Sequence, residues 1–408
     1  MRSPALRGLG LLLLLPTAKG DAGPADGGAP KVAAAPPPRL VTPILGHPRL
    51  WLRPEDPPRL RAWAKASNPL WSEGLRAVGE RAREEMDRHG LLDRAGCERA
   101  PAPCEAYAEL FAFLSLVEPS AQERQDYGRR GHAVLMGLLR RAARPVPGDP
   151  LGAPDFSVGN ASRWSGEAFP LAVDWLYPRL AAADKAMARQ VFLRWSEEQL
   201  RASVMGADHP APVGLLHDPA LLADRPRRRA AANNYFCAHL RNLTLMALAL
   251  DPADDPDEPA VGRTYRRLGD YLANAVGAWL YMNDHLLRHE ARGGLSPEGD
   301  QYGPQSLAYV AQTHLALRTA GVADPKVWGP AVELDGHPFW DRLVPAFLHH
   351  LSPSPRRRPE GEGLAFQPHW MGDGQVYDLG DWIDLFAPFG VLGRLRGRDG
   401  IFDAARWI

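Results

Sequence analysis

The sequence predicts an all-α protein, because apolar residues recur at spacings of three and four along most of the chain. Proline- and glycine-containing clusters separate these segments, for example at residues 145–148 and 251–256. Runs of alternating β-branched residues, which would indicate strands, do not exceed a few positions. The predicted helices cover residues 56–66, 69–89, 103–117, 121–143, 165–178, 182–204, 229–250, 261–288, 304–320, 337–351 and 379–394.

These helices are expected to form an irregular (α/α) toroid, an incomplete ring of helical hairpins. About eleven helices without a sheet can pack as hairpins or as a solenoid. A fixed repeat period is absent from the sequence, which disfavours a regular solenoid such as a TPR array. The chain has 408 residues, of which 45% are hydrophobic, and is long enough to bury a large core. We expect the helical domain to span residues 45–408.

The N-terminal residues have the pattern of a targeting signal. Arg2 and Arg7 precede an apolar run, Leu9–Leu15, and small residues follow it. That order predicts a secretory signal peptide over residues 1–20, followed by an Ala/Gly/Pro-rich linker over 21–44. Because no other stretch approaches the ~20 apolar residues of a membrane helix, we expect a secreted or periplasmic protein without an integral span after signal removal.

The charge balance makes nucleic acid an unexpected partner. Lys and Arg number 48, as do Asp and Glu, whereas phosphate binding favours a net basic face. Two local basic runs, 225–229 and 356–358, are either solvated loops or subsites for an anionic polymer.

The three cysteines and the paired histidines do not predict a metal site. Cys97 and Cys104 flank a proline-rich loop that a disulfide could close, and their pairing is left open. Cys237 lies in a helical apolar pattern and is expected to be buried. His285 and His289 share a helix face, but the HExxH order is absent. We therefore expect neither a metal nor a cofactor.

Two junctions between predicted helices carry the polar residues of greatest interest. One helical run stops at Gly293-Gly294, and Glu298 and Tyr302 follow before the next helix is expected near Gln305. Glycines at such a position let the backbone approach a ligand closely. At the other junction Asn233 and Asn234 open a helix, where one can cap it. We expect Asn234 to face a cleft.

Three segments, in this order and spacing, resemble the helical domain of heparinase II/III-type polysaccharide lyases and their alginate-lyase relatives. The resemblance spans roughly residues 47–395. Its motifs are His47-Pro-Arg-Leu-Trp51 with Asn68-Pro-Leu-Trp71; Asn233-Asn-Tyr235 with Asp174-Trp175 upstream; and Gly293-Gly-x-x-x-Glu298-Gly-x-x-Tyr302, followed later by Pro368-His-Trp-Met-Gly372-Asp373.

The resemblance implies a helical toroid that holds an acidic polysaccharide and cuts it by β-elimination. In such lyases an Asn or His neutralises the C5 carboxylate, a His or Tyr removes the C5 proton, and a Tyr protonates the leaving oxygen. Asn234 matches the neutralising position and Tyr302 the tyrosine position. A histidine often follows the cleft asparagine in alginate-lyase relatives, but Tyr235 stands there, so the base is unassigned. The C-terminal β-sandwich of the lyases has no counterpart after residue 395.

The chemistry of Asn234 and Tyr302 suits those roles independently. A proton next to a carboxylate is removable only if the developing enediolate is stabilised by preorganised donors. Asn234 offers two N–H donors without a charge to desolvate. Tyr302, with an ordinary pKa near ~10, needs a nearby cation to act as acid or base, and Arg292 and His289 are close in sequence.

The remaining predicted site residues are assigned to substrate contact or proton transfer. His369 precedes the turn at 372–374 and is a candidate catalytic residue. The predicted substrate-binding residues are Tyr235, His239, Arg292, Glu298 and Trp164. The Trp164 ring matches the apolar face of a pyranose, although it is equally suited to a core position.

Two other functions remain open. A glycoside hydrolase on the same helical scaffold would need two carboxylates roughly 5–10 Å apart, which Glu298, Asp300 and Asp373 could supply. A non-catalytic glycan-binding protein is favoured by the missing sandwich.

Overall fold

The structure is a computed structural model that describes residues 43, 46–144, 146–152, 154–204, 207–208, 219–223, 225–357, 363–366 and 379–407. Within these ranges the protein is all-α, as the sequence predicted. The strands described are two short antiparallel pairs, β1 (Ser203–Val204) with β2 (Ala207–Asp208) and β3 (Arg356–Arg357) with β4 (Leu364–Ala365). The predicted signal peptide and His369 lie outside the described residues.

Longer helices alternate with short helical turns along the chain. The long helices are α2 (Arg76–His89), α4 (Cys104–Val117), α5 (Ala121–Ala143), α9 (Ala182–Arg201), α12 (Asn234–Ala249), α14 (Gly277–His289), α15 (Gly299–Thr319), α17 (Trp340–His350) and α18 (Leu379–Leu395). The shorter ones are α1 (Asp56–Trp63), α3 (Arg94–Arg99), α6 (Pro154–Val158), α7 (Asn160–Ser165), α8 (Ala168–Trp175), α10 (Pro219–Ala223), α11 (Arg225–Ala230), α13 (Leu268–Tyr271), α16 (Pro325–Trp328) and α19 (Asp399–Trp407). Single π or 3₁₀ turns occur at Leu70–Leu75, Pro150–Gly152, Tyr177–Arg179, Pro252–Asp254, Leu272–Val276 and Gly329–Val332.

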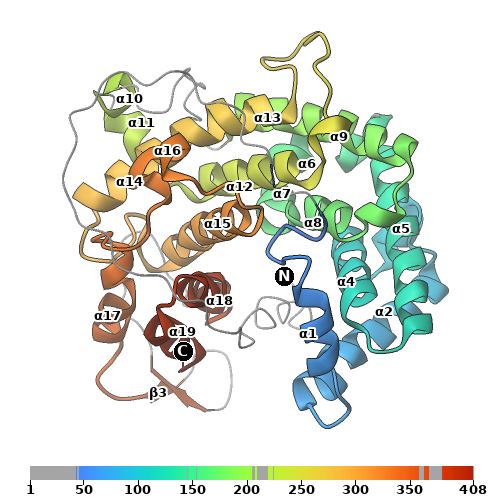
Figure 1. Ribbon diagram of the computed structural model, residues 1–408, viewed down its shortest axis with the longest axis horizontal. Helices are drawn as coiled ribbons and strands as arrows, with labels where there is room; N and C mark the ends of the chain where they lie inside the picture. The colour runs from blue at the N-terminus through green and yellow to red at the C-terminus, as the bar shows by residue number, and fades with distance from the viewer. Residues whose placement is uncertain are drawn as a thin grey trace.

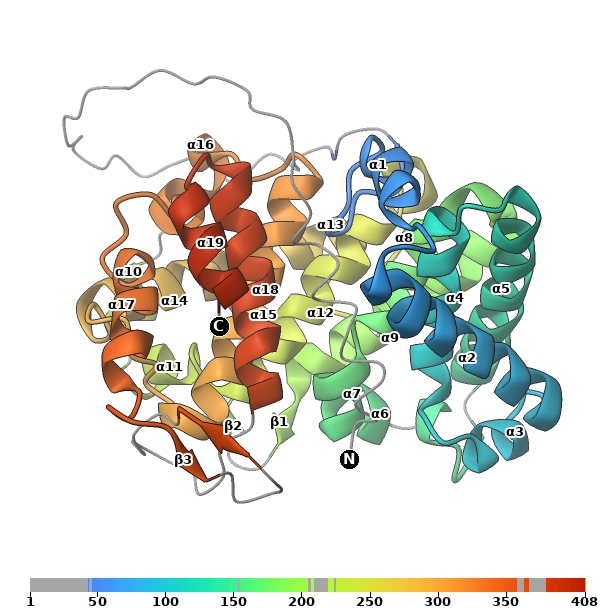
Figure 2. The ribbon, with the colours of Figure 1, turned by 90° about the horizontal axis from the view of Figure 1, so that it is seen from below.

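One row of helices runs through the middle of the molecule. In it α4 contacts α8, α8 contacts α12, α12 contacts α15, and α15 contacts α18 (Figure 1). Figure 2 shows the same succession from α18 through α15 and α12 to α4. Helix α12 is buried on nearly all sides, and Phe236, Leu240 and Leu243 belong to its share of the core. Because nearly all of its residues are buried, α12 occupies the centre of the fold.

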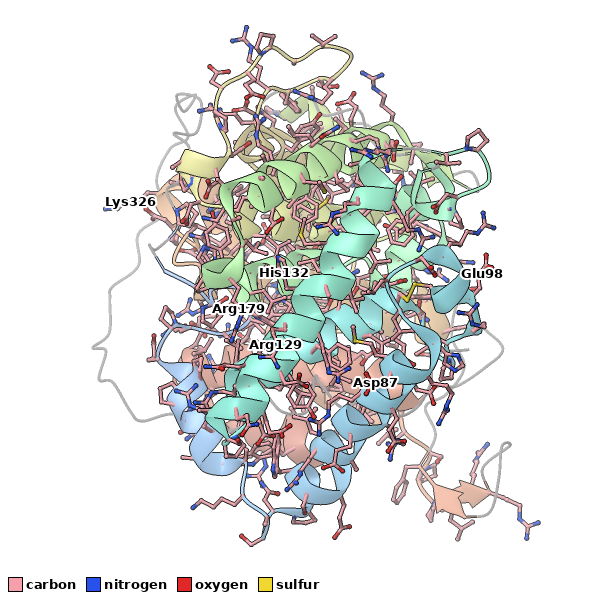
Figure 3. All side chains as sticks on the ribbon, turned by 90° about the vertical axis from the view of Figure 1, so that its right-hand side faces the viewer. Asp87, Glu98, Arg129, His132, Arg179 and Lys326 are labelled. Atoms are coloured by element: carbon pink, nitrogen blue, oxygen red, sulfur yellow. A yellow bond between two sulfur atoms is a disulfide. The ribbon has the colours of Figure 1, made fainter. Side chains whose placement is uncertain are left out.

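A second row of helices packs against the first. Helix α5 pairs with α4 and contacts α9, which in turn contacts α12 and α13. The face of α5 that is turned away from α4 is polar, and Figure 3 shows Arg129 and His132 on it. The Cys97–Cys104 disulfide joins α3 to the start of α4, with Cα atoms 5.5 Å apart, so this pairing is confirmed. Cys237 is buried, as expected.

The segment from His47 to Trp51 is fixed to the core by one buried carboxylate. Asp174 of α8 accepts hydrogen bonds from the backbone N–H groups of Arg49 and Leu50, both at 2.9 Å from Oδ2. His47 Nδ1 lies 2.6 Å from Asp174 Oδ1, and its ring stacks on Tyr177. This part of the resemblance motif therefore anchors the chain to α8.

The predicted helix boundaries agree closely at α5 and differ by several residues at α12 and α15. Helix α5 covers the predicted 121–143, and Ser120 caps it by accepting from the N–H of Glu123. Helix α12 begins at Asn234 instead of residue 229, because Asn233 is its N-cap. Helix α15 begins at Gly299 instead of residue 304, so Tyr302 lies inside its first turns. Pro304, which is typical of a helix start, lies within the helix.

No helix among the described residues combines the length and the apolar character that a bilayer crossing requires.

Candidate functional site

The N-terminus of α12 is built by an asparagine cap. Asn233 has an extended backbone, and its Oδ1 accepts hydrogen bonds from the N–H groups of Tyr235 and Phe236 at 3.0 and 3.2 Å. An asparagine at this position satisfies amides that the first helical turn leaves unpaired. The cap therefore fixes the position of Asn234, which is the first residue of the helix.

The N-terminus of α15 depends on glycines at two positions. Gly294 and Gly299 have φ values of +89° and +74°, a region that side chains disfavour. A Cβ at Gly294 would lie 2.6 Å from the backbone of Arg342. The chain can thus turn sharply after α14 and bring Glu298 directly in front of α15.

Glu298 joins the two helix N-termini. Its Oε1 accepts a hydrogen bond from Asn233 Nδ2 at 3.1 Å, and its Oε2 accepts one from Ser306 Oγ at 2.8 Å. Burial raises the pKa of Glu298, although hydrogen bonds from Ser306, the Asn234 backbone and the Asn233 side chain oppose the rise. The carboxylate thus holds α12 and α15 together, and its substrate-binding role stays a prediction.

The two predicted catalytic residues within the described part both lie at this junction. Asn234 is 4% exposed, and its side-chain amide makes no hydrogen bond to another described residue. Tyr302 is half-buried in α15, and its hydroxyl makes no hydrogen bond within the described ranges. An amide and a phenol with unused hydrogen-bonding capacity are therefore carried by helices that Glu298 links.

Two aromatic rings and one guanidinium contact one another near the start of α12. The Tyr235 hydroxyl donates to Asn160 Oδ1 at 2.8 Å, and the Arg163 guanidinium lies 4.4 Å from the centre of the Tyr235 ring. The same guanidinium lies 5.0 Å from the ring of Trp164, which is 38% exposed. Helix α7 therefore supplies Asn160, Arg163 and Trp164 to the predicted site on α12.

Of the remaining predicted site residues, His239, Arg292 and His369, the first two differ from one another in burial and position. His239 is fully buried, with its ring 6.4 Å from that of Tyr235. Arg292 is exposed in the turn between α14 and α15. His369 falls outside the described residues. Of these three, only His239 is shown in contact with another predicted site residue.

The buried side chain of Arg241 connects α12 to neighbouring residues of α15 and to Glu167. Arg241 of α12 is fully buried; its Nη2 lies 2.9 Å from Glu167 Oε2 and its Nη1 donates to Gln312 Oε1 at 2.9 Å. The Arg241 guanidinium also lies 4.6 Å from the centre of the Tyr309 ring. These contacts tie α12 to α15 and to the residue that precedes α8.

Two of the carboxylates considered for hydrolysis, Asp300 and Glu298, already have polar partners within the protein. Asp300 lies 3.1 Å from His350 Nε2, and Glu298 is bonded as described above. Asp373 lies outside the described residues. In the part of the chain that the structure covers, no group of three or more His, Cys, Asp or Glu side chains is placed to hold a metal ion.

A separate open pocket of about 730 Å³ lies along α9, lined by Val158, Gln190, Arg194, Glu197, Glu198, Arg201, Ala202, Val261, Gly262 and Arg263. The Glu197 carboxylate, which lines this pocket, already has partners within the protein. Burial alone would raise the pKa of Glu197, but hydrogen bonds from Tyr271 and Thr264 hold it below the ordinary value. Arg201 pairs with the same carboxylate.

No family model, no curated protein and no solved structure matches this chain. The assignment of a function therefore depends on the chemistry of the residues.

The sequence did not single out Asn160, Arg163 or Ser306. Arg163 is separated by long stretches of chain from Tyr235 and Glu298, and nothing in its local pattern indicates that they meet. Ser306, eight residues after Glu298, lies two helical turns along the same face and could have been suspected if the start of α15 had been placed correctly.

Proposed function

We propose that this protein is a polysaccharide lyase that cleaves a uronate-containing polysaccharide by β-elimination. The observation that carries the proposal is the pairing of the α12 and α15 N-termini through Glu298, which places Asn234 and Tyr302 on linked helices. Trp164, which is 38% exposed and contacts Arg163, offers an apolar face of the kind that packs on sugar rings.

Each residue has a defined task in this reaction. The C5 proton leaves, the electron pair forms a C4–C5 double bond, the bond from C4 to the glycosidic oxygen breaks, and a proton is delivered to that oxygen. Asn234 donates N–H groups to the carboxylate as charge develops on it. Tyr302 protonates the leaving oxygen. His369 and Tyr302 are the candidates for the base.

We further propose that the two rows of helices form an incomplete (α/α) toroid. The pairing of α4 with α5, and the contacts of α9 with α12 and α13, support an arrangement in hairpins. The protein is also proposed to be secreted or periplasmic. The Cys97–Cys104 disulfide supports export, since such bonds persist in oxidising compartments.

A survey of uronate polymers tests the reaction. Purified protein is incubated with alginate, hyaluronan, chondroitin and heparan sulfate, and ultraviolet absorbance and reducing ends are followed together. Elimination produces an unsaturated uronate, so both signals are expected to rise in parallel on at least one polymer. Reducing ends without absorbance would indicate a hydrolase, and binding without either signal would indicate a non-catalytic glycan-binding protein.

A further inference from the structure

Arg163 carries a buried guanidinium that forms no ion pair with any residue that the structure describes. The residue is 6% exposed, and its Nε is buried without a hydrogen bond. Within the described ranges its guanidinium makes no ion pair or hydrogen bond, and its contacts are the faces of Tyr235 and Trp164. Burying an ionised group without a partner is strongly unfavourable.

Other buried arginines show what a structural role requires. Arg241 bonds Glu167, Gln312 and Asn242. Arg189 pairs with Asp255 and Glu258 at 2.9 and 2.6 Å. Arg163 differs from both: Glu298 interacts with it electrostatically but lies beyond the 4.0 Å of an ion pair, and the Glu298 carboxylate is bonded to Asn233 and Ser306.

The surroundings of Arg163 fit an incoming anion on a sugar. Stacking on Tyr235 orients the guanidinium plane, and Tyr235 is the residue next to Asn234. A guanidinium fork matches a carboxylate with two parallel hydrogen bonds. The Trp164 ring, 5.0 Å from the same guanidinium and 38% exposed, is a surface on which a pyranose ring can pack.

We infer that Arg163 is the residue that binds the carboxylate of a uronate unit in the substrate, together with the Asn234 amide. This inference deepens the proposed lyase function and rests on it. The carboxylate supplies the missing counter-charge for Arg163, and Arg163 in turn stabilises the negative charge that grows on the carboxylate when the C5 proton leaves. A sulfate group shares the same chemistry, and the test separates the two.

The test measures binding, without reference to turnover, by titration calorimetry. The probes are tetrasaccharides of alginate, hyaluronan and heparan sulfate, each in its native form and with its carboxyl groups reduced to alcohols. The proteins are the wild type, Arg163→Gln, Arg163→Lys and the surface control Arg129→Gln, whose side chain is 68% exposed on α5 (Figure 3). Thermal unfolding without ligand establishes that each variant is folded.

Arg163→Gln should weaken binding of a native tetrasaccharide by roughly 10- to 100-fold, the range of a charge-assisted hydrogen-bonded pair. The affinity of Arg163→Lys should lie between those of the wild type and Arg163→Gln, because lysine keeps the charge but cannot form the two parallel hydrogen bonds of a guanidinium. Arg129→Gln should bind like the wild type. Carboxyl reduction should weaken the wild type, and Arg163→Gln should then add little further loss, since both changes remove one interaction.

Three results would overturn the inference: a wild type that binds none of the native tetrasaccharides, an Arg163→Gln protein that binds them as tightly as the wild type, or an equal loss on native and carboxyl-reduced probes. Retained tight binding of carboxyl-reduced heparan sulfate through Arg163 would assign the residue to sulfate and overturn it as well. A wild type that binds through Arg163 yet releases no unsaturated product would leave this inference standing and refute the lyase reaction.

Discussion

Asn234 and Tyr302 come from distant parts of the sequence, and a few polar contacts link the two helices that carry them. Glu298 receives hydrogen bonds from Asn233 and Ser306, so the two helices that carry the proposed catalytic residues share one buried carboxylate. Asn234, Tyr302 and Glu298 were candidates from the sequence because asparagine and glycine at helix starts have local signatures. It could not identify Arg163, whose significance arises only from the long-range contact with Tyr235.

Tyr302→Phe tests the proton transfer assigned to the phenol. The substitution keeps the ring and removes the O–H, so ground-state packing survives. General acid–base steps contribute typically ~10²–10⁴-fold, and we expect kcat to fall by about that factor with KM little changed. Steady-state kinetics on the polymer that gives most unsaturated product provide the measurement.

The matched control for this variant is Tyr265→Phe. Tyr265 is half-buried near α13, and its hydroxyl likewise makes no hydrogen bond within the described residues. It should keep full activity. If both variants turn over as fast as the wild type, Tyr302 is not the acid.

At the scale of elements, long and strongly periodic helices were predicted well, and short ones were not. Helix α5 has a serine cap and arginines in its last turn, and both ends agree with the prediction. Helices α6, α7, α10 and α11 contain five or six residues each, too few to display a period. Their positions are set by packing, and Arg163, the proposed carboxylate-binding residue, lies on one of them.

Asn233→Ala tests whether the α12 cap positions the site. The change removes the cap, worth typically ~1 kcal/mol, and one donor to buried Glu298. We expect the free energy of unfolding to fall by about 2 kcal/mol and activity to fall as well, because Asn234 is no longer held in place. Urea unfolding and the elimination assay measure the two effects.

Ser120→Ala removes a comparable cap from α5, which belongs to the second row of helices. This control should lose up to about 1 kcal/mol of stability and keep its activity. An Asn233→Ala protein that is destabilised but as active as the Ser120→Ala control would contradict the positioning role of Asn233.

At the scale of the whole molecule, one buried acid should make stability depend on pH. Burial of Glu105 on α4, with repulsion from Glu167 as a smaller cause, raises its pKa from 4.5 to about 7. Between these values the folded protein holds a proton that the unfolded chain has released. Stability should therefore fall as pH rises through this window and stay at its lower value above it.

Glu105→Gln should abolish that dependence. At pH ~8 the variant should unfold at a higher urea concentration than the wild type, and its free energy of unfolding should be larger by an amount on the order of 1–3 kcal/mol. At pH ~5 the two proteins should unfold at similar urea concentrations. Unfolding curves at the two pH values provide the comparison. Equal pH slopes for the two proteins would show that Glu105 is not responsible.

The rows of helices place α12 at the centre of the molecule and its N-terminus beside α15 (Figures 1 and 2). All-α architecture followed directly from the periodicity of the sequence. The contacts between the rows of helices could not be predicted in this way, because side-chain packing between distant helices leaves no local pattern in the sequence. The proposed function therefore depends most on whether an acidic saccharide occupies the α12–α15 junction.

A crystal structure of the Tyr302→Phe protein with a bound uronate tetrasaccharide tests this claim most directly. We predict that one carboxylate of the saccharide lies within hydrogen-bond distance of the Asn234 amide and the Arg163 guanidinium, with a sugar ring against Trp164. A saccharide bound in the pocket along α9, with the junction between α12 and α15 empty, would contradict the account.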